Sequence, residues 1–394
     1  MTDPSNSVGS YPGSKVRTDS PGFEPGASPR FAPRTAVCQV RSLPSAITVS
    51  GCTLTMARLE RVSPEEAVQM YLQNRQAEIS QSTLYEHRTR LNRFTEWADS
   101  IEALEDMSHM TRQLAFRYKS YRTEEVAPST LENEMRTFRL FVRFCENYGC
   151  CSEGVAASID IPTAPKSKRS RDEQLEPENA EKILDYLSNY EYCSFRHVLF
   201  SLMWNMGARI SGIRALDVGD YHETSPDGPF IEFKHQPETE TPLKNGWKSE
   251  RKPPIREALS EVIADWIDTR RPDVEDKHGR KPLLATEQGR PAKSTIQRNI
   301  YSITRPCFYT GECPHDRVQD NCEAVGDYNH ASKCPSSRSP HTLRRGRATE
   351  NANNSMPEEM ICDRMDMSPE VFREHYRQQT EEDKRSLQRE FFDE

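Results

Sequence analysis

The stretch Met-Gly-Ala-Arg-Ile-Ser at residues 206–211 decides how this chain is interpreted, together with His-Thr-Leu-Arg at 341–344 and Glu-His-Tyr at 374–376. The first two stretches each supply an arginine, whose planar guanidinium can hold both non-bridging oxygens of a phosphodiester. The histidine of the second stretch can move a proton near neutral pH, and the tyrosine of the third can carry a phosphate covalently. Their order and spacing together predict a metal-free phosphoryl-transfer site.

The composition indicates an intracellular chain of more than one domain. With 394 residues, of which 35% are hydrophobic and 29% charged, the chain is long enough for two or three hydrophobic cores. We expect a cytoplasmic protein without membrane contact, because no apolar run approaches the length of a membrane span and no signal peptide begins the sequence. The net charge of −8 excludes a generally basic protein, but a local basic groove can still bind DNA.

Residues 1–62 are rich in Gly, Pro and Ser and lack a helical or strand period, so we expect a disordered tail. The codons of Gly22 to Pro25 are compatible with the T-arm of a transfer-RNA gene. This leads to the hypothesis that the true start is Met56 and that the residues before it are translated from DNA adjacent to the gene.

Residues 63–155 have the pattern of a small helical domain. Ser63, Pro64 and Glu66 form a helix start signal, and apolar stripes predict further helices after Ser82, over 112–121 and from Pro128 to Gly149. Several arginines are interleaved with the apolar positions: Arg88, Arg90, Arg93, Arg136, Arg139 and Arg143. Taken alone they are interpreted as a solvated polar face, and a surface that follows DNA phosphates is the alternative.

The second half of the chain follows a basic linker at residues 156–176. From residue 177 to 380 the pattern is mostly helical, with a break at Gly207. Short strands are predicted near Phe230 and Ile255, on either side of the polar turn at 244–251.

The end of the chain also has a helical period, over residues 368–391, and this segment could dock on a neighbouring subunit. Residues 381–394 are expected to form a helical tail.

Taken together, these residues resemble the tyrosine recombinase, or phage integrase, family over residues 63–380. The likeness is strongest to integrases of salt-loving archaea, which share phrases such as Ser-Pro-His-x-x-Arg-Arg-Gly (339–346) and Arg-Met-Asp-x-Ser-Pro-Glu-Val (364–371). The resemblance implies a mainly α fold with a small β-sheet. It also implies a two-domain clamp, in which a helical SAM-like core-binding domain is joined to an α/β catalytic domain.

The resemblance assigns roles to residues in the first part of the predicted site. Arg209 matches the first phosphate-clamping arginine, but the glutamate that usually follows it is replaced by Gly212, which removes one orienting group. Lys244 matches the lysine on a β-hairpin that donates a proton to the departing 5′ oxygen. Lys248 competes for this role because the turn is longer than usual, and a solvated turn lysine is the alternative for both.

The remaining catalytic matches are His341, Arg344 and Tyr376. His341 and Arg344 lie three residues apart, so a helix would place them on one face, where Arg344 completes the clamp and His341 assists proton transfer. Tyr376 would attack phosphorus and form a 3′-phosphotyrosine. Many family members carry His or Trp nine residues before this tyrosine, whereas this chain has Met367, which cannot donate a strong hydrogen bond to phosphate.

An insertion at residues 305–335 departs from the general family pattern. It contains Cys307, Cys313, Cys322 and Cys334, with His315 and His330 between them. Four thiolates suffice for a tetrahedral structural zinc, which would stiffen the loop before His341. Reduced cysteines in a loop are the alternative, because the spacing lacks tight Cys-x2-Cys pairs.

The resemblance thus implies a site-specific DNA recombinase or integrase that needs no cofactor for catalysis. Its partners would be double-stranded DNA attachment sites, on which four copies would assemble as a homotetramer. Gly212 and Met367 leave open a non-catalytic DNA-binding relative with the same fold. A zinc-stabilised helical interaction protein is a third interpretation, but it does not explain why the four matched residues occur in the family's order.

Overall fold

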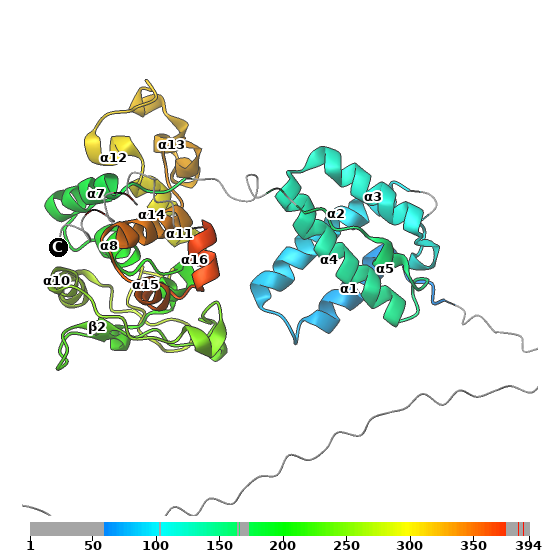
Figure 1. Ribbon diagram of the computed structural model, residues 1–394, viewed down its shortest axis with the longest axis horizontal. Coiled ribbons are helices and arrows are strands. Elements are labelled where there is room, and N and C mark those ends of the chain that lie inside the picture. Colours follow the sequence, from blue (N-terminus) through cyan, green and yellow to red (C-terminus); the bar gives the residue numbers. More distant parts are fainter. Residues whose placement is uncertain are drawn as a thin grey trace, which may run out of the picture.

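The computed structural model describes residues 59–101, 104–163, 165 and 173–375, together with Arg385 and Arg389. These residues form two bodies with separate hydrophobic cores, an N-terminal body before residue 164 and a C-terminal body from residue 173 (Figure 1). Residues 1–58, which include the proposed start Met56, lie outside the described residues, and so does the expected helical tail apart from the two arginines.

The N-terminal body is entirely helical in its regular structure. Its elements are α1 (Pro64–Arg75), α2 (Gln81–Asp99), η1 (Met107–His109), α3 (Arg112–Glu125), α4 (Pro128–Asn147) and α5 (Val155–Ser158). The predicted start signal is confirmed: the Ser63 hydroxyl accepts a hydrogen bond from the Glu66 N–H at 3.2 Å, and the Glu66 carboxylate accepts one from the Ser63 N–H at 3.2 Å. The second helix starts slightly earlier than expected, because Ser80 provides its cap.

Aromatic rings fill the core of the N-terminal body. The Phe94 ring lies 4.9 Å from that of Phe138 and 5.3 Å from that of Tyr118, centroid to centroid. Beside this cluster the buried Arg122 donates a hydrogen bond from Nε to Glu134 at 2.8 Å, which compensates both buried charges. The core therefore fixes how α2, α3 and α4 pack.

Several arginines of the N-terminal body form ion pairs on their own helices. Arg90 pairs with Glu86 at 2.8 Å, Arg93 with Glu96 at 2.9 Å, and Arg136 with Glu132 at 2.7 Å. Such pairs are typical of a solvated helix face and lower the local positive charge. They agree with the interpretation of these arginines as a polar face.

The C-terminal body contains the remaining elements. Its helices are α7 (Pro177–Tyr190), α8 (Phe195–Met206), α9 (Ile210–Ala215), α10 (Glu257–Asp265), α11 (Lys293–Ile303), α12 (Pro306–Thr310), α13 (Glu323–Gly326), α14 (Pro340–Asn353), α15 (Glu358–Met365) and α16 (Pro369–His375). Shorter turns are η2 (Val218–Asp220), η3 (Pro237–Thr239), η4 (Gly246–Ser249), the π-helical η5 (Trp266–Arg270), η6 (Gln319–Asn321) and η7 (Tyr328–Lys333).

Helix α8 is the centre of this body, because α7, α10, α11 and α14 all contact it (Figure 1). Its sequence is apolar on nearly every side, and Val198, Leu199, Leu202 and Met203 are all buried. A helix of this kind needs neighbours all round. Helix α14, which carries His341 and Arg344, and helix α9, which follows Arg209, are therefore both packed on one buried helix.

The sheet is smaller than the sequence pattern predicts. Strands β1 (Tyr221–His222) and β2 (Phe230–Ile231) pair antiparallel, with Tyr221 opposite Ile231. The expected strand beyond the polar turn forms only isolated bridges to this sheet, in which the Phe233 N–H donates to the Arg251 carbonyl at 2.9 Å. Pro253 accepts a hydrogen bond from the Ile231 N–H at 3.2 Å but has no N–H to return one, which leaves the pairing incomplete.

The prediction of a mainly helical fold with a small sheet is confirmed. Among the described residues, no helix is both long enough and apolar enough to cross a membrane.

Gly346 allows the closest approach of α14 to its surroundings. A Cβ at this position would overlap the carbonyl oxygen of Leu175, in a segment that also bonds to α14 through the Leu175 N–H and the Thr342 carbonyl at 3.2 Å. Alanine usually stabilises a helix relative to glycine, so overlap with backbone must reverse the sign here.

We expect Gly346→Ala to lower the free energy of unfolding by about 1–3 kcal/mol, measured as a lower thermal midpoint. Gly219→Ala is the matched control, because a Cβ there meets nothing within 4 Å. Equal midpoints for the two variants would contradict this account of α14 packing.

Candidate active site

The first predicted arginine is positioned by a sharp end to α8. Gly207 ends this helix in the left-handed conformation with φ 54°, and a Cβ there would overlap the Met365 side chain. The chain then turns and starts α9 directly after Arg209. Arg209 donates from Nη1 to the backbone carbonyl of Asp366 at 2.6 Å and also pairs with the Asp366 carboxylate.

The second arginine reaches the same place from α14. Arg344 is only 2% exposed and donates from Nη1 to the carbonyls of Gly207, at 2.8 Å, and Met365. Its Nη2 donates to the Asp366 carbonyl at 3.3 Å. Two guanidinium groups from distant parts of the sequence thus converge on one carbonyl oxygen, which is the arrangement that a two-arginine phosphate clamp requires.

These arginines line a pocket of about 300 Å³ formed by α9, α11 and α14. Three of the predicted catalytic residues share it, since His341 also lies in its wall. His341 is exposed whereas Arg344 is buried, so the helical spacing of three residues brings both to one pocket at different depths.

Lys293 also lines this pocket, and the sequence patterns did not single it out. Burial lowers the pKa of Lys293, and the positive charges of Arg214 and Lys244 lower it further. Its signal in the sequence is slight, a lysine at the first residue of a helix that follows a Gly-Arg-Pro turn. Only its placement beside the arginines distinguishes it from other surface lysines.

Lys244 and Lys248 lie on either side of the start of η4, and both are exposed. Lys244 is close enough to the pocket to affect the pKa of Lys293. The segment between the two lysines is anchored by Asn245, whose Nδ2 donates to the Asp366 carboxylate at 3.1 Å. The assignment of Lys244 as the proton donor stays a prediction.

Arg251 holds the hairpin against α15. It donates from Nε to the Arg364 carbonyl at 2.9 Å and from Nη1 to the Ser249 carbonyl at 2.9 Å, and its guanidinium lies 4.0 Å from the centre of the Phe233 ring. Burial lowers the pKa of Arg251 to about 10. A Cβ at Gly212 would approach this same ring to 3.3 Å, so a glutamate at 212 would have to displace it.

Met367, which departs from the family pattern, and Tyr376, which matches it, have different outcomes. Met367 is 8% exposed and packs with Ile361, Met365 and Phe372 in a small core, so it serves packing where many family members place a polar group. Tyr376 lies outside the described residues, directly after α16. Its role as nucleophile therefore stays a prediction.

The cysteine-bearing segment covers one end of the C-terminal body, around α12 and α13 (Figure 1). Cys307, Cys313, Cys322 and Cys334 are free thiols of intermediate exposure. Burial raises the pKa of Cys307, and the charges of Cys334, Cys313 and Cys322 are near enough to raise it further. Within the described part of the chain, no group of His, Cys, Asp or Glu side chains is arranged to hold a metal ion.

The two histidines of this segment have other contacts. His315 Nε2 lies 3.0 Å from the Ser336 hydroxyl, and His330 Nδ1 lies 3.2 Å from the Glu323 carboxylate. The segment is fixed to α11 by Tyr328, whose hydroxyl accepts a hydrogen bond from Asn299 at 2.7 Å. It therefore packs directly on one of the helices that form the pocket.

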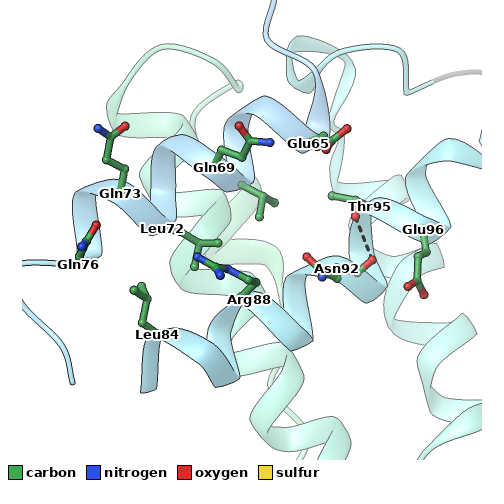
Figure 2. A pocket seen from close by; sticks show the side chains of 11 residues that line it. Glu65, Gln69, Leu72, Gln73, Gln76, Leu84, Arg88, Asn92, Thr95 and Glu96 are labelled. Carbon is green, nitrogen blue, oxygen red and sulfur yellow. Dashed lines mark hydrogen bonds between the residues drawn. The ribbon is translucent and has the colours of Figure 1, made fainter. Parts of the chain in front are cut away.

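A separate groove of about 580 Å³ lies between α1 and α2 in the N-terminal body (Figure 2). Its lining combines the cationic Arg88 with Glu65, Glu96 and several amides, above an apolar floor that includes Leu72. This mixed charge argues against a phosphate site, and none of the predicted catalytic residues lines the groove.

A search against protein-family models gave no match, and a search of curated proteins gave none either. Solved structures do match. A lambda integrase tetramer bound to a Holliday junction superposes with a TM-score of 0.55 at 11% sequence identity, covering 82% of this chain and 80% of that one. A lambda integrase dimer bound to a core site gives a TM-score of 0.54 at 11% identity, with 80% and 77% coverage.

The Tn1549 transposon integrase, in complex with a circular intermediate DNA, gives a TM-score of 0.51 at 14% identity and covers 82% of this chain and 99% of that one. These matches extend over both bodies, and at such identities they concern the fold. The predicted architecture is thereby confirmed: the chain has the fold of the tyrosine recombinases.

Proposed function

We propose that this protein cleaves and rejoins DNA strands as a site-specific recombinase or integrase, through a 3′-phosphotyrosyl intermediate. The observation that carries the proposal is the convergence of Arg209 and Arg344 on one oxygen, in a pocket that also contains His341. Two fixed guanidinium groups directed at one point suit the non-bridging oxygens of a phosphodiester.

In this proposal the chemistry requires no metal. The Tyr376 oxygen attacks phosphorus and gives up its proton with help from His341, while the bond from phosphorus to the 5′ oxygen breaks. Lys244 donates a proton to that oxygen, because an alkoxide leaves poorly without one. Arg209 and Arg344 neutralise the charge on the pentacoordinate phosphorus, and attack by a 5′-hydroxyl on the phosphotyrosine reverses the steps.

The proposed partner is double-stranded DNA carrying attachment sites. A structural match of the same fold is a lambda integrase tetramer on a Holliday junction, and we propose that four copies of this chain likewise act together on two sites. Contacts to phosphates would supply most of the affinity, and contacts to bases would select the site. A DNA-binding protein that does not cleave is the second candidate, favoured by the packing role of Met367.

We also propose that the four clustered cysteines hold a structural zinc ion. Thiolates are suitable ligands, and Cys307 lies within electrostatic reach of the other three. The partly exposed segment would have to rearrange to bring the sulfurs together, and the binding of thiolates to the metal would drive that rearrangement. The ion would stiffen the segment that leads into α14 and take no part in catalysis.

Covalent trapping tests the central proposal. The full chain is incubated with DNA that carries a nick beside a candidate attachment site, over a range of salt concentrations, so that the cleaved short strand diffuses away and prevents rejoining. We expect a covalent protein–DNA band on a denaturing gel, absent in Tyr376→Phe because phenylalanine has no nucleophile. Tyr190→Phe, at an exposed tyrosine, serves as the control. DNA binding without a covalent band would favour the non-catalytic candidate.

The choice of lysine has its own test. We expect Lys244→Ala to slow single-turnover cleavage by about 10²- to 10⁴-fold, whereas Lys248→Ala cleaves like the unaltered protein. A substrate with sulfur in place of the bridging 5′ oxygen should restore cleavage by Lys244→Ala, because a thiolate leaves without a proton. Rescue of Lys248→Ala or Lys293→Ala by sulfur, without rescue of Lys244→Ala, would disprove the assignment.

Metal analysis of the purified protein tests the zinc site. We expect about one zinc per chain, loss of zinc in Cys313→Ser, and a lower thermal midpoint in that variant because the metal contributes folding energy. Cys193→Ser, at a buried cysteine outside the segment, should retain the metal. Unaltered protein that lacks zinc after expression in zinc-supplemented medium would exclude the site.

A further inference from the structure

Asp366 contacts both arginines of the candidate site, Arg209 through its carbonyl and carboxylate and Arg344 through its carbonyl. It follows α15 in the left-handed conformation, with φ 53° and ψ 67°, which costs free energy for a residue with a side chain. Asn and Asp are among the few residues that tolerate this conformation. The position is therefore compatible with a residue retained for what its side chain contacts.

The carboxylate of Asp366 joins three segments that belong to the candidate site. It pairs with Arg209, accepts a hydrogen bond from Asn245 Nδ2 at 3.1 Å and accepts another from the Ser249 hydroxyl at 2.8 Å. Its side chain is only 14% exposed. One group thus connects the start of α9, the turn with the two candidate lysines, and the segment that leads to Tyr376.

The contacts that hold Arg209 leave its Nε and Nη2 donors available for a phosphate. Its contacts to the carbonyl and the carboxylate of Asp366 both use Nη1. Arginine has five N–H donors, so Nε and Nη2 can still form a two-pronged contact with phosphate. Two anchors on one nitrogen fix a long side chain that would otherwise lose rotamer freedom on binding its substrate.

The glycine at position 212 explains why Arg209 needs a carboxylate from elsewhere in the chain. The family's orienting glutamate is missing there, and the Phe233 ring lies against the position that its side chain would need. We propose that Asp366 is the positioning residue for Arg209 and replaces the missing glutamate from the segment that follows α15. This inference rests on the proposed function, because it concerns how the same arginine meets the scissile phosphate.

A competing role for Asp366 predicts the opposite result. A carboxylate beside the clamp could imitate phosphate and block the arginines until DNA displaces it, in which case its removal would speed cleavage. The bonds from Asn245 and Ser249, neither of which belongs to the clamp, favour a fixed group over a displaceable one. The shared Asp366 carbonyl, to which both arginines bond, also favours a permanent anchor.

The test compares single-turnover cleavage and DNA affinity of the full chain with those of Asp366→Asn and Asp366→Gly. Both variants can adopt the left-handed backbone, so the side chain alone is altered. We expect cleavage to slow by about 10- to 100-fold, with DNA affinity unchanged or slightly higher because a negative charge is lost. Asp363→Asn, which removes an equal charge at an exposed position of α15, should cleave normally.

A double-mutant cycle separates positioning from general loss of structure. In an Arg209→Ala background, Asp366→Asn should have no further effect on the slow residual cleavage, because the aspartate acts through that arginine. Additive losses, or unchanged or faster cleavage by a folded Asp366 variant, would overturn the inference while leaving the proposed function intact. Absence of any covalent adduct with the unaltered protein would overturn both.

Discussion

Two positive charges held around one carbonyl oxygen are the constraint on which the rest of the C-terminal body depends. Two guanidinium groups that share one acceptor atom repel each other, and partial burial weakens the screening of that repulsion by water. Arg209 and Arg344 are kept in this arrangement by the Asp366 carbonyl, the Asp366 carboxylate and the carbonyl of Gly207. A folded chain can maintain such repulsion only if many other contacts hold the supporting backbone in place.

Those contacts come from residues that are not among the predicted catalytic residues and only support them. The buried helix α8 fixes where Gly207 turns the chain, and Gly346 lets α14 press against the Leu175 segment. Arg251, stacked on Phe233, ties the hairpin to the end of α15. The strain of a left-handed aspartate is stored where these elements meet, as is common at sites that must be preorganised before substrate arrives.

Local structure was largely predictable because it depends on neighbours in sequence. The capping box at Ser63, the helix break at Gly207 and the helical spacing of His341 and Arg344 each follow from a few adjacent residues. The sheet was predicted less well, since the pattern around Ile255 is that of a strand whereas Pro253 and Pro254 limit its pairing. Lys293 was not predicted because a single charged residue at a helix end has no distinctive pattern, and nothing in the sequence predicts that Asp366 pairs with Arg209.

The sequence by itself determined that the chain is mainly helical, that its helices start and stop near the predicted residues, and which residue types could perform phosphoryl transfer. Only the tertiary structure decided that Arg209 and Arg344 share an acceptor, that Lys293 lines the same pocket, and that the Asp366 carboxylate pairs with Arg209. The physical reason is the distance along the sequence over which each kind of interaction acts. Helix signals act over a few residues, whereas these contacts bridge segments that meet only when α8 is buried by its neighbours.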